Sequence, residues 1–283
     1  MEIKSLSNTS HDELFRAFEQ AFADYELQLN KTELLTMLKR RGFNPELSFA
    51  AFEGDKIVSF TCNGIGDFNG TRMAYDTGTG TLKDYRGKGL ATQIFEYSIP
   101  HLREAGIKEY LLEVLQHNTG AVSVYSKLGF EVTREFYYFR TEPEQIKNEV
   151  KTPDFPYTLK TININEHGSI PNFWDFNPSW QNSIESINRT LEDFICLGVF
   201  TEGKLVGYEV FDPTSGDVTQ IAVDKPYRHK GIGSLLFQKM IESNKHASIK
   251  IVNTDISCDS IIAFLKAKNI EPTGKQFEMI KKL

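Results

Sequence analysis

Some residue types are scarce in this sequence, and each scarcity argues against a class of protein. The 283 residues contain three cysteines, Cys62, Cys196 and Cys258, which stand far apart and form no Cys-x-x-Cys pair. Scattered cysteines in an odd number argue against a disulfide framework and a zinc site, and they fit reduced thiols in a cytoplasm. No apolar run approaches the roughly 18 residues of a membrane-spanning helix, and Met1–Leu14 is too polar for a signal peptide. We therefore expect a cytoplasmic protein with no membrane partner.

Positive charge is also in the minority. Lysine and arginine total 32 against 38 aspartates and glutamates, which gives a net charge of −6. Nucleic acids and anionic membranes attract basic surfaces, so neither is an expected partner. Histidines, cysteines and carboxylates form no group with the spacing of a metal site, and we expect no metal.

The composition that remains is that of a globular protein, with 40% hydrophobic and 25% charged residues. The length suits two domains of about 140 residues better than one core. The most informative stretch is Thr77–Ala91, TGTGTLKDYRGKGLA, which predicts a strand, a charged turn and a glycine-rich loop that opens an amphipathic helix. The glycines let a ligand approach the backbone, and consecutive N–H groups at a helix start can hold an anion such as a pyrophosphate.

The pattern occurs twice in the chain. Tyr85–Ala91 (YRGKGLA) recurs 142 residues later as Tyr227–Gly233 (YRHKGIG). The strand–turn–strand pattern of Leu47–Gly64 likewise recurs as Phe194–Val210. A repeat of this extent predicts two copies of one domain.

The loop resembles the pyrophosphate loop of the GNAT acetyltransferase superfamily, [R/Q]-x-x-G-x-[G/A], whose fixed positions are filled by Arg86, Gly89 and Ala91. It matches neither a Walker loop nor a dinucleotide-binding glycine motif; without the resemblance, it would equally suit a basic turn that caps a helix. The resemblance implies the α/β class (α+β, with a mixed sheet) and two tandem GNAT-like acyl-CoA N-acyltransferase domains. The expected boundaries are 1–142 for the first domain, 143–156 for a polar linker and 157–283 for the second domain.

The resemblance also implies acetyl-coenzyme A (acetyl-CoA) as a co-substrate. The residues expected to bind it are those of the loop, two threonines of the preceding strand and one asparagine: Arg86, Gly87, Lys88, Gly89, Leu90, Ala91, Thr79, Thr81 and Asn118. A backbone N–H near Thr79–Thr81 would polarise the thioester carbonyl. Phe22, Tyr25 and Phe43 are candidates for the wall of the acceptor groove.

Acetyl transfer to an amine needs a base for the ammonium and an acid for the departing thiolate. The run L-E-V, then N, then Y-x-x-x-G-F within residues 112–130 is similar to GNAT members that acetylate protein N-termini. In those members the matching Glu is the base and the matching Tyr is the acid, so the resemblance implies Glu113 as base, with Asp76 in reserve, and Tyr125 as acid. Two structural alternatives stay open, because Glu113 could form a salt bridge and Tyr125 could simply pack.

The second copy lacks this pair. With an offset of 140 residues, the positions of Glu113, Asn118 and Tyr125 are taken by Asn253, Cys258 and Leu265. We therefore expect the first domain to react, and the second to support it or to bind coenzyme. Pro171–Trp180, at the entry of the second domain, holds both tryptophans, for which packing between domains competes with a place in a ligand wall.

The predicted function is that of an N-acetyltransferase that moves acetyl from acetyl-CoA to a primary amine by direct attack through a tetrahedral intermediate. The amine could belong to a small molecule or a peptide, and the protein could be a monomer or a homodimer. The alternative is a non-catalytic acyl-CoA-binding sensor, which would bind without turnover. A nucleotide-phosphate enzyme is disfavoured because the Walker spacing and an acidic metal cluster are absent.

Overall fold

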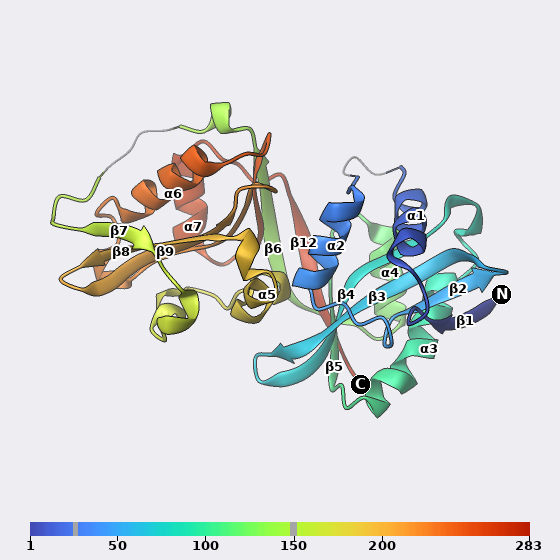
Figure 1. The fold of residues 1–283 in the computed structure, drawn as a ribbon. Helices are drawn as coiled ribbons and strands as arrows, with labels where there is room; N and C mark the ends of the chain where they lie inside the picture. Colours follow the sequence, from blue (N-terminus) through green and yellow to red (C-terminus); the bar gives the residue numbers. More distant parts are fainter. Residues whose placement is uncertain (25–27, 148–151) are drawn as a thin grey trace. The chain divides into compact units, whose positions relative to one another are not determined.

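The computed structural model describes residues 1–24, 28–147 and 152–283, which Figure 1 colours along the chain. They form two compact units. The first unit comprises residues 1–134, 188–190 and 277–283, and the second comprises 135–187 and 191–276. Packing therefore divides the chain differently from the predicted boundaries, since 135–142 belong to the second unit, and 188–190 and 277–283 belong to the first. Tyr25 and residues 148–151 of the predicted linker lie outside the described residues.

The first unit is a sheet covered by helices on both faces. Its strand order is β1-β2-β3-β4-β5-β12, with antiparallel pairing from β1 to β4 and parallel pairing between β4 and β5. The predicted mixed sheet of the α/β class is confirmed. The strands are β1 Glu2–Ser5, β2 Phe49–Glu53, β3 Lys56–Phe68, β4 Thr71–Thr81, β5 Glu109–Leu115 and β12 Gly274–Lys282, of which β12 belongs to this unit from Phe277 on. The helices are α1 His11–Ala21, α2 Lys31–Arg40, α3 Leu90–Glu104 and α4 Thr119–Lys127.

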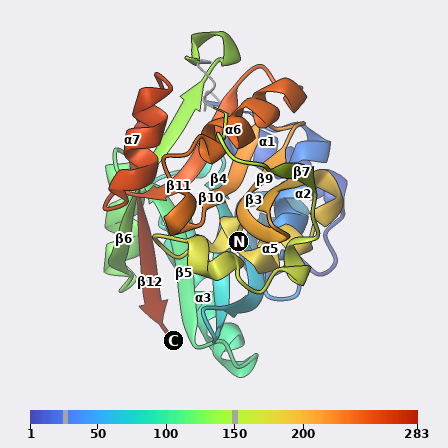
Figure 2. The same cartoon turned by 90° about the vertical axis from the view of Figure 1, so that its left-hand side faces the viewer.

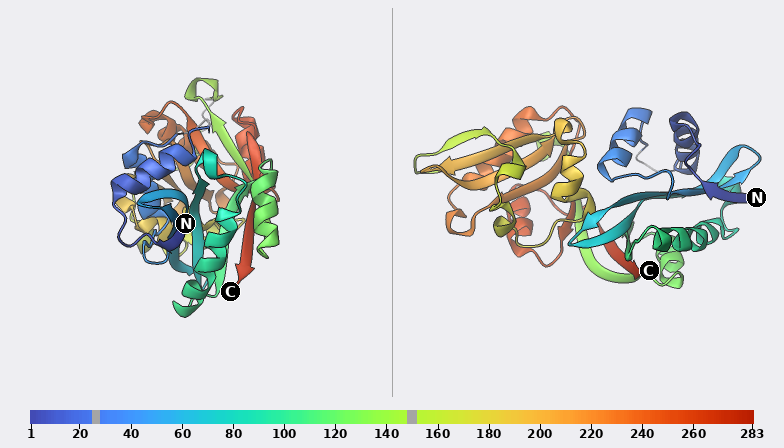
Figure 3. Two further views of the ribbon diagram at one scale, coloured as in Figure 1. Left: turned by 90° about the vertical axis from the view of Figure 1, so that its right-hand side faces the viewer. Right: turned by 60° about the horizontal axis from the view of Figure 1, so that its bottom comes forward.

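Local sequence explains where the first two helices begin. Ser10 and Asn30 are N-cap residues, and each forms a reciprocal capping box with the glutamate three positions later, Glu13 and Glu33. Such boxes satisfy backbone N–H groups that the first helical turn leaves without partners. The apolar sides of α1 and α2 pack on one face of the sheet, while α3 and α4 cover the opposite face, as the right-hand view of Figure 3 shows.

The second unit has the same arrangement of strands as the first but a different N-terminal segment. Its strand order is β6-β11-β10-β9-β8-β7, again with one parallel pair, β10 with β11. Where the first unit has α1 and α2, the second has short 3₁₀ turns at Ile164–Glu166, Ile170–Phe173 and Trp180–Asn182. Figure 2 turns this unit toward the viewer. The elements are β6 Glu131–Thr141, β7 Thr158–Thr161, β8 Ile195–Thr201, β9 Lys204–Asp212, β10 Asp217–Val223, β11 Ile249–Asp255, α5 Ile184–Asn188, α6 Ile232–Ser243 and α7 Asp259–Ala267.

The final residues of the chain complete the first unit. The carboxylate of Glu278, which is 2% exposed, accepts hydrogen bonds from Arg134 Nε at 2.9 Å and Arg134 Nη2 at 2.6 Å. Its Oε1 also lies 2.9 Å from Thr133 Oγ1. Detaching β12 would separate this ion pair and leave Arg134 without its carboxylate. Because an unpaired buried charge is costly, the pair favours the position of β12 in the first unit.

Two further findings concern the whole described chain. All three cysteines are free and buried. Within residues 1–24, 28–147 and 152–283, no helix combines the length and the hydrophobicity that crossing a bilayer requires.

Candidate functional site

The site in the first unit begins where β4 and β5 separate. The two strands pair only over Met73–Tyr75 and Glu109–Leu111. Just beyond this pairing, the register between β3 and β4 shifts by one residue. Asn63 lies opposite Asp76 and Cys62 lies opposite Gly78, so Thr77 is an extra residue in β4. Such a bulge bends its strand. The separation lies at the C-terminal ends of parallel strands, where ligands bind in open α/β sheets.

Glu113 lies on the α1/α2 face of this separation. Its neighbours in β5, Leu112 and Val114, point into the core beneath α3 and α4, and alternation along the strand turns Glu113 the other way. The phenol of Tyr75 donates to Glu113 Oε2 at 3.0 Å. Burial, and then the charge of Glu113, raise the pKa of Tyr75 well above its ordinary value, so the phenol stays protonated and remains a donor. The guanidinium of Arg41 lies 6.0 Å from the centre of the Tyr75 ring.

Tyr125 lies on the α3/α4 face and meets a different carboxyl. Its hydroxyl is 3.3 Å from Asp76 Oδ2. Asp76 also accepts from the backbone N–H of Gly78 at 2.9 Å and from Thr79 Oγ1 at 2.9 Å. The structure therefore brings Tyr125 to Asp76, the reserve base, and Glu113 to Tyr75.

The glycine loop leads directly into α3. Gly87 and Gly89 have φ of 74° and 73°, a left-handed conformation that other residues adopt at a cost. Gly89 is the N-cap of α3 and no side chain caps the helix, so the first N–H groups of Leu90 and Ala91 are presented by the helix start itself. The Leu90 side chain is buried in the core at 4% exposure, which leaves only its backbone for a ligand.

The Arg86 side chain braces this loop. Its Nη2 donates to the carbonyl of Ala21 at 2.8 Å, Nη1 to Asp24 at 3.1 Å and Nε to the carbonyl of Thr81 at 3.2 Å. The Lys88 ammonium is exposed and lies 4.8 Å from the centre of the Tyr85 ring.

The other residues expected to bind coenzyme already have local partners. Asn118 is the N-cap of α4, where its Oδ1 accepts from the N–H of Ala121 at 3.2 Å. Thr81 Oγ1 lies 2.7 Å from the Ser59 hydroxyl. Phe22 and Phe43, two candidates for the acceptor wall, pack against the core of the α1/α2 face.

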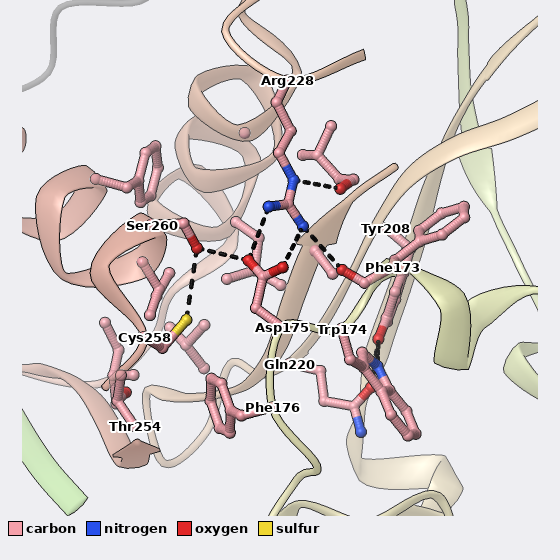
Figure 4. Close-up of a pocket in the computed structure, with 18 of the residues that line it drawn as sticks. Phe173, Trp174, Asp175, Phe176, Tyr208, Gln220, Arg228, Thr254, Cys258 and Ser260 are labelled. Atoms are coloured by element: carbon pink, nitrogen blue, oxygen red, sulfur yellow. Dashed lines mark hydrogen bonds and ion pairs between the residues drawn. The ribbon is translucent and has the colours of Figure 1, made fainter. Parts of the chain in front are cut away.

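The second unit contains a cavity of about 800 Å³ at the corresponding place (Figure 4). The residues that line it come from the loop at Arg228–Gly233, from β10 and β11, from α7, and from Phe173–Pro178. Arg228 is bound as Arg86 is, with Nη2 donating to the Phe173 carbonyl at 3.1 Å, Nη1 to Asp175 at 2.8 Å and Nε to the Val223 carbonyl at 3.0 Å. The second loop is thus built like the first.

The positions matched with Glu113, Asn118 and Tyr125 carry other side chains in the second unit. Leu265 is fully buried in the core, and Cys258 lies at the N-cap of α7, next to Ser260 (Figure 4). The Asn253 side chain donates to Ser179 Oγ at 2.8 Å. The three positions that differ from the first unit therefore hold an alkyl chain, a thiol and an amide.

Sequence reasoning missed several of these residues. Tyr75 and Arg41 are not predicted by the sequence, because a linear pattern does not show which residue of a neighbouring strand a glutamate contacts. Trp174 lines the cavity and donates to the Tyr208 hydroxyl at 2.6 Å, so a place in a ligand wall stays a prediction for this tryptophan. The sequence feature that could have indicated this cavity wall is a tryptophan within a segment rich in Phe, Asn and Pro.

Comparison with known proteins agrees with the repeat. A model of the Acetyltransferase (GNAT) family matches residues 10–130 and again 161–263. N-alpha-acetyltransferase MAK3 of Arabidopsis thaliana is 33% identical over 95 residues, which are 34% of this chain and 50% of that protein. The probable N-acetyltransferase san of Drosophila melanogaster is 35% identical over 101 residues, 35% of this chain and 55% of that protein. The chain thus spans about half the length of these curated relatives.

Solved structures match along nearly the whole chain. A tandem GNAT protein from the clavulanic acid biosynthesis pathway superposes with a TM-score of 0.75 at 14% identity, covering 99% of this chain and 98% of the other. A GCN5-related N-acetyltransferase from Sphaerobacter thermophilus gives 0.73 at 13% identity, covering 99% and 95%. At such identities these matches establish the fold, and the tandem arrangement predicted from the repeated loop is confirmed. With both halves matched by one family model, the chain is an acyltransferase that belongs to the GNAT acetyltransferase family.

Proposed function

We propose that the protein is an N-acetyltransferase that moves acetyl from acetyl-CoA to a primary amine, and that the first unit carries out the reaction. One observation carries the proposal. Where β4 and β5 separate, a carboxylate and a phenol meet on one face of the sheet, Glu113 with Tyr75, and a second such pair meets on the other, Asp76 with Tyr125. A proton can therefore be taken from the amine on one face of the sheet and given to the leaving thiolate on the other, at the same opening between β4 and β5.

The residues of the loop fit a pyrophosphate. The left-handed Gly87 and Gly89 place no side chain in front of the helix, and the start of α3 offers backbone N–H groups and the positive end of its dipole. The Arg86 guanidinium contributes by fixing the loop rather than by pointing out of it, since two of its bonds go to backbone carbonyls. Lys88 is exposed beside the loop and adds positive charge.

In the proposed reaction the amine nitrogen attacks the thioester carbon, the C–S bond breaks, and an amide and a thiol result. Glu113 accepts the proton of the ammonium, directly or through water, and the Tyr75 hydroxyl holds its carboxylate in place. Tyr125 donates a proton to the departing sulfur. A backbone N–H near Thr79–Thr81 polarises the thioester carbonyl.

For the second unit, a binding role without transfer is the second candidate. Its cavity of about 800 Å³ opens on a loop built like the first, yet Leu265 and Asn253 stand at the positions of Tyr125 and Glu113, the acid and base proposed for the first unit. A coenzyme held there would lack the acid that Tyr125 is proposed to supply in the first unit.

A thiol-release assay with acetyl-CoA and a panel of amines tests the proposal. The panel holds a peptide α-amine, a lysine side chain, a polyamine and an amino sugar. We expect turnover with at least one of them, and Glu113→Gln should lower kcat by about 100-fold with coenzyme affinity unchanged. Glu109→Gln is the matched control, because Glu109 lies at the start of the same strand and on the same face by alternation. This variant should keep the wild-type kcat. Coenzyme binding with no turnover on any amine would refute the proposal and favour a sensor.

A further inference from the structure

Asp76 is a carboxyl buried at the centre of the first unit, at 9% exposure. It occupies the β4 position opposite Asn63, immediately before the extra residue of the bulge. Its two oxygens accept from a backbone N–H and a threonine hydroxyl, and the second oxygen also faces the Tyr125 hydroxyl. A buried carboxyl at a ligand-binding opening needs an explanation, because an apolar residue would cost less to bury.

Asp76 is poorly placed to take a proton from the amine. Ala74, two residues earlier in β4, points into the core under α3 and α4, and Asp76 points to the same side, where it meets Tyr125 of α4. Glu113 and Tyr75 lie on the α1/α2 face. The two carboxyls are thus divided by the sheet, and the one that shares a face with Tyr125 is Asp76.

We propose that Asp76 is a positioning residue for Tyr125: its protonated carboxyl donates to the Tyr125 oxygen, turns the phenolic hydrogen toward the sulfur, and replaces the proton that Tyr125 gives up. The inference rests on the proposed function. As the C–S bond breaks, sulfur leaves with the electron pair and takes the Tyr125 proton, while the Tyr125 oxygen takes the Asp76 proton. The resulting carboxylate is reprotonated from solvent, which has received the proton released by the amine, so the turnover is balanced.

The surroundings of Asp76 make both of its protonation states accessible. Burial raises its pKa to about 6, against the hydrogen bonds from Thr79, Gly78 and Tyr125 and the charge of Arg41. The ionisable and charged groups that face it from the packed elements are Arg41 after α2, Cys62 of β3, Tyr75 of β4, Tyr110 of β5 and Tyr125 of α4. Burial raises the pKa of Cys62, Tyr75 and Tyr110 above their ordinary values, so of these four buried groups Asp76 is the one that changes charge near neutral pH.

The second unit shows what the same place looks like without the pair. The residue 142 positions after Asp76, the spacing of the two glycine loops, is Val218, and the residue matched with Tyr125 is Leu265. Both are buried in one hydrophobic core, at 2% and 0% exposure. The carboxyl and the phenol are thus both replaced by alkyl groups that pack in the same core. This joint replacement is expected if Asp76 and Tyr125 function as a pair.

The test is the pH dependence of kcat for Asp76→Asn, Tyr125→Phe and the double variant. The asparagine amide can still donate to the Tyr125 oxygen but has no proton to pass on. We expect the ratio of wild-type to Asp76→Asn kcat to fall by about tenfold per pH unit between pH 6 and 8, as Asp76 loses its proton. The KM for acetyl-CoA should not change. In the Tyr125→Phe background, Asp76→Asn should change kcat by less than about twofold, because the shared step has already been lost.

Asp212→Asn is the matched control. Asp212 is also 9% exposed, accepts from the backbone N–H of Thr214 at 2.9 Å, and accepts from the Ser215 hydroxyl. It lies in the second unit and has no tyrosine as a hydrogen-bond partner among the described residues. It should leave kcat and its pH profile unchanged. Equal losses from Asp76→Asn in the wild-type and Tyr125→Phe backgrounds, or a ratio that does not move with pH, would overturn the role of Asp76 alone. A wild-type protein that releases no thiol with any amine would overturn the proposed function and this inference with it.

Discussion

A buried glutamate in the second unit gives a quantitative prediction about stability. Glu209 in β9 is 1% exposed, and neither carboxyl oxygen has a hydrogen-bond partner among the described residues. Its neighbours across the sheet are Leu197 and Ile221. Gly207, on the same face, lies under Ile232 of α6, where an added Cβ would come within 2.5 Å. Burial in this apolar setting raises the pKa of Glu209 to about 9.

The magnitude follows from linkage. In the unfolded chain the carboxyl titrates near its ordinary pKa of 4.5, so between that value and about 9 the folded state holds a proton that the unfolded state has lost. A raised carboxyl pKa contributes stability that is fully present below the unfolded pKa and is lost as pH rises through the folded one. Each pH unit in this window removes about 1.4 kcal/mol. From pH 5 to pH 8 the loss attributable to Glu209 is about 4 kcal/mol, an order-of-magnitude figure.

The measurement is urea unfolding of the wild type and Glu209→Gln at pH 5, 6.5 and 8. A buried amide without partners costs about 1–3 kcal/mol at every pH. The difference in unfolding free energy between the variant and the wild type at one pH is therefore uninformative, and the test is how this difference changes with pH. Glu209→Gln should gain on the wild type by more than 1 kcal/mol per pH unit across this range. Glu271→Gln, an exposed glutamate in the same unit, should run parallel to the wild type. Parallel curves for Glu209→Gln as well would refute the reasoning, because they would mean that the folded carboxyl ionises normally.

Three further predictions concern the first unit and its comparison with the second. Tyr125→Phe should lower kcat by about 100-fold with KM for acetyl-CoA unchanged, whereas Leu265→Ala should cost about 2–5 kcal/mol of stability and leave kcat of the folded protein intact; equal losses of turnover would contradict the assignment of the reaction to the first unit. Glu278→Ala should lower the free energy of unfolding by about 3 kcal/mol in a urea titration, because Arg134 is left partly buried without its carboxylate; a loss below about 0.5 kcal/mol would show that the pair behaves as a surface ion pair. Gly89→Ala forces a side chain into a left-handed conformation at about 1–2 kcal/mol, in otherwise open space, so KM for acetyl-CoA should rise roughly tenfold with kcat kept; an unchanged KM would exclude this loop from coenzyme binding.

Features set by neighbouring residues could be predicted from the sequence. Ser10 and Asn30 are each followed three positions later by a glutamate, a pattern that predicts a helix start, and α1 and α2 begin there with the capping boxes that these glutamates allow. The glycine loop, the strand before it and the helix after it also stand where the pattern placed them. Each of these depends on contacts within about four residues, which a linear pattern records directly.

Features set by distant contacts could not be predicted. Residues 277–283 belong to the first unit although they end the second copy, since strand pairing depends on which edges are available and not on the strand's own residues. The pairing of Tyr125 with Asp76 depends on the extra residue of β4, which a sequence pattern does not mark. The partners of Glu113 follow from the alternation of β5, but only once β4 is known to be its parallel neighbour.

The duplicated loop is built in the same way in both units. Arg86 donates to the carbonyls of Ala21 and Thr81, and Arg228 donates to the carbonyls of Phe173 and Val223, so in both units the arginine ties the loop to the entry segment and to the end of the preceding strand. A residue that holds the backbone in shape is needed wherever the loop is built, whether or not acetyl is transferred there. The recurrence of the loop is therefore evidence for the fold. Evidence for the reaction has to come from groups that exchange protons, and these differ between the units where Asp76 and Tyr125 give way to Val218 and Leu265.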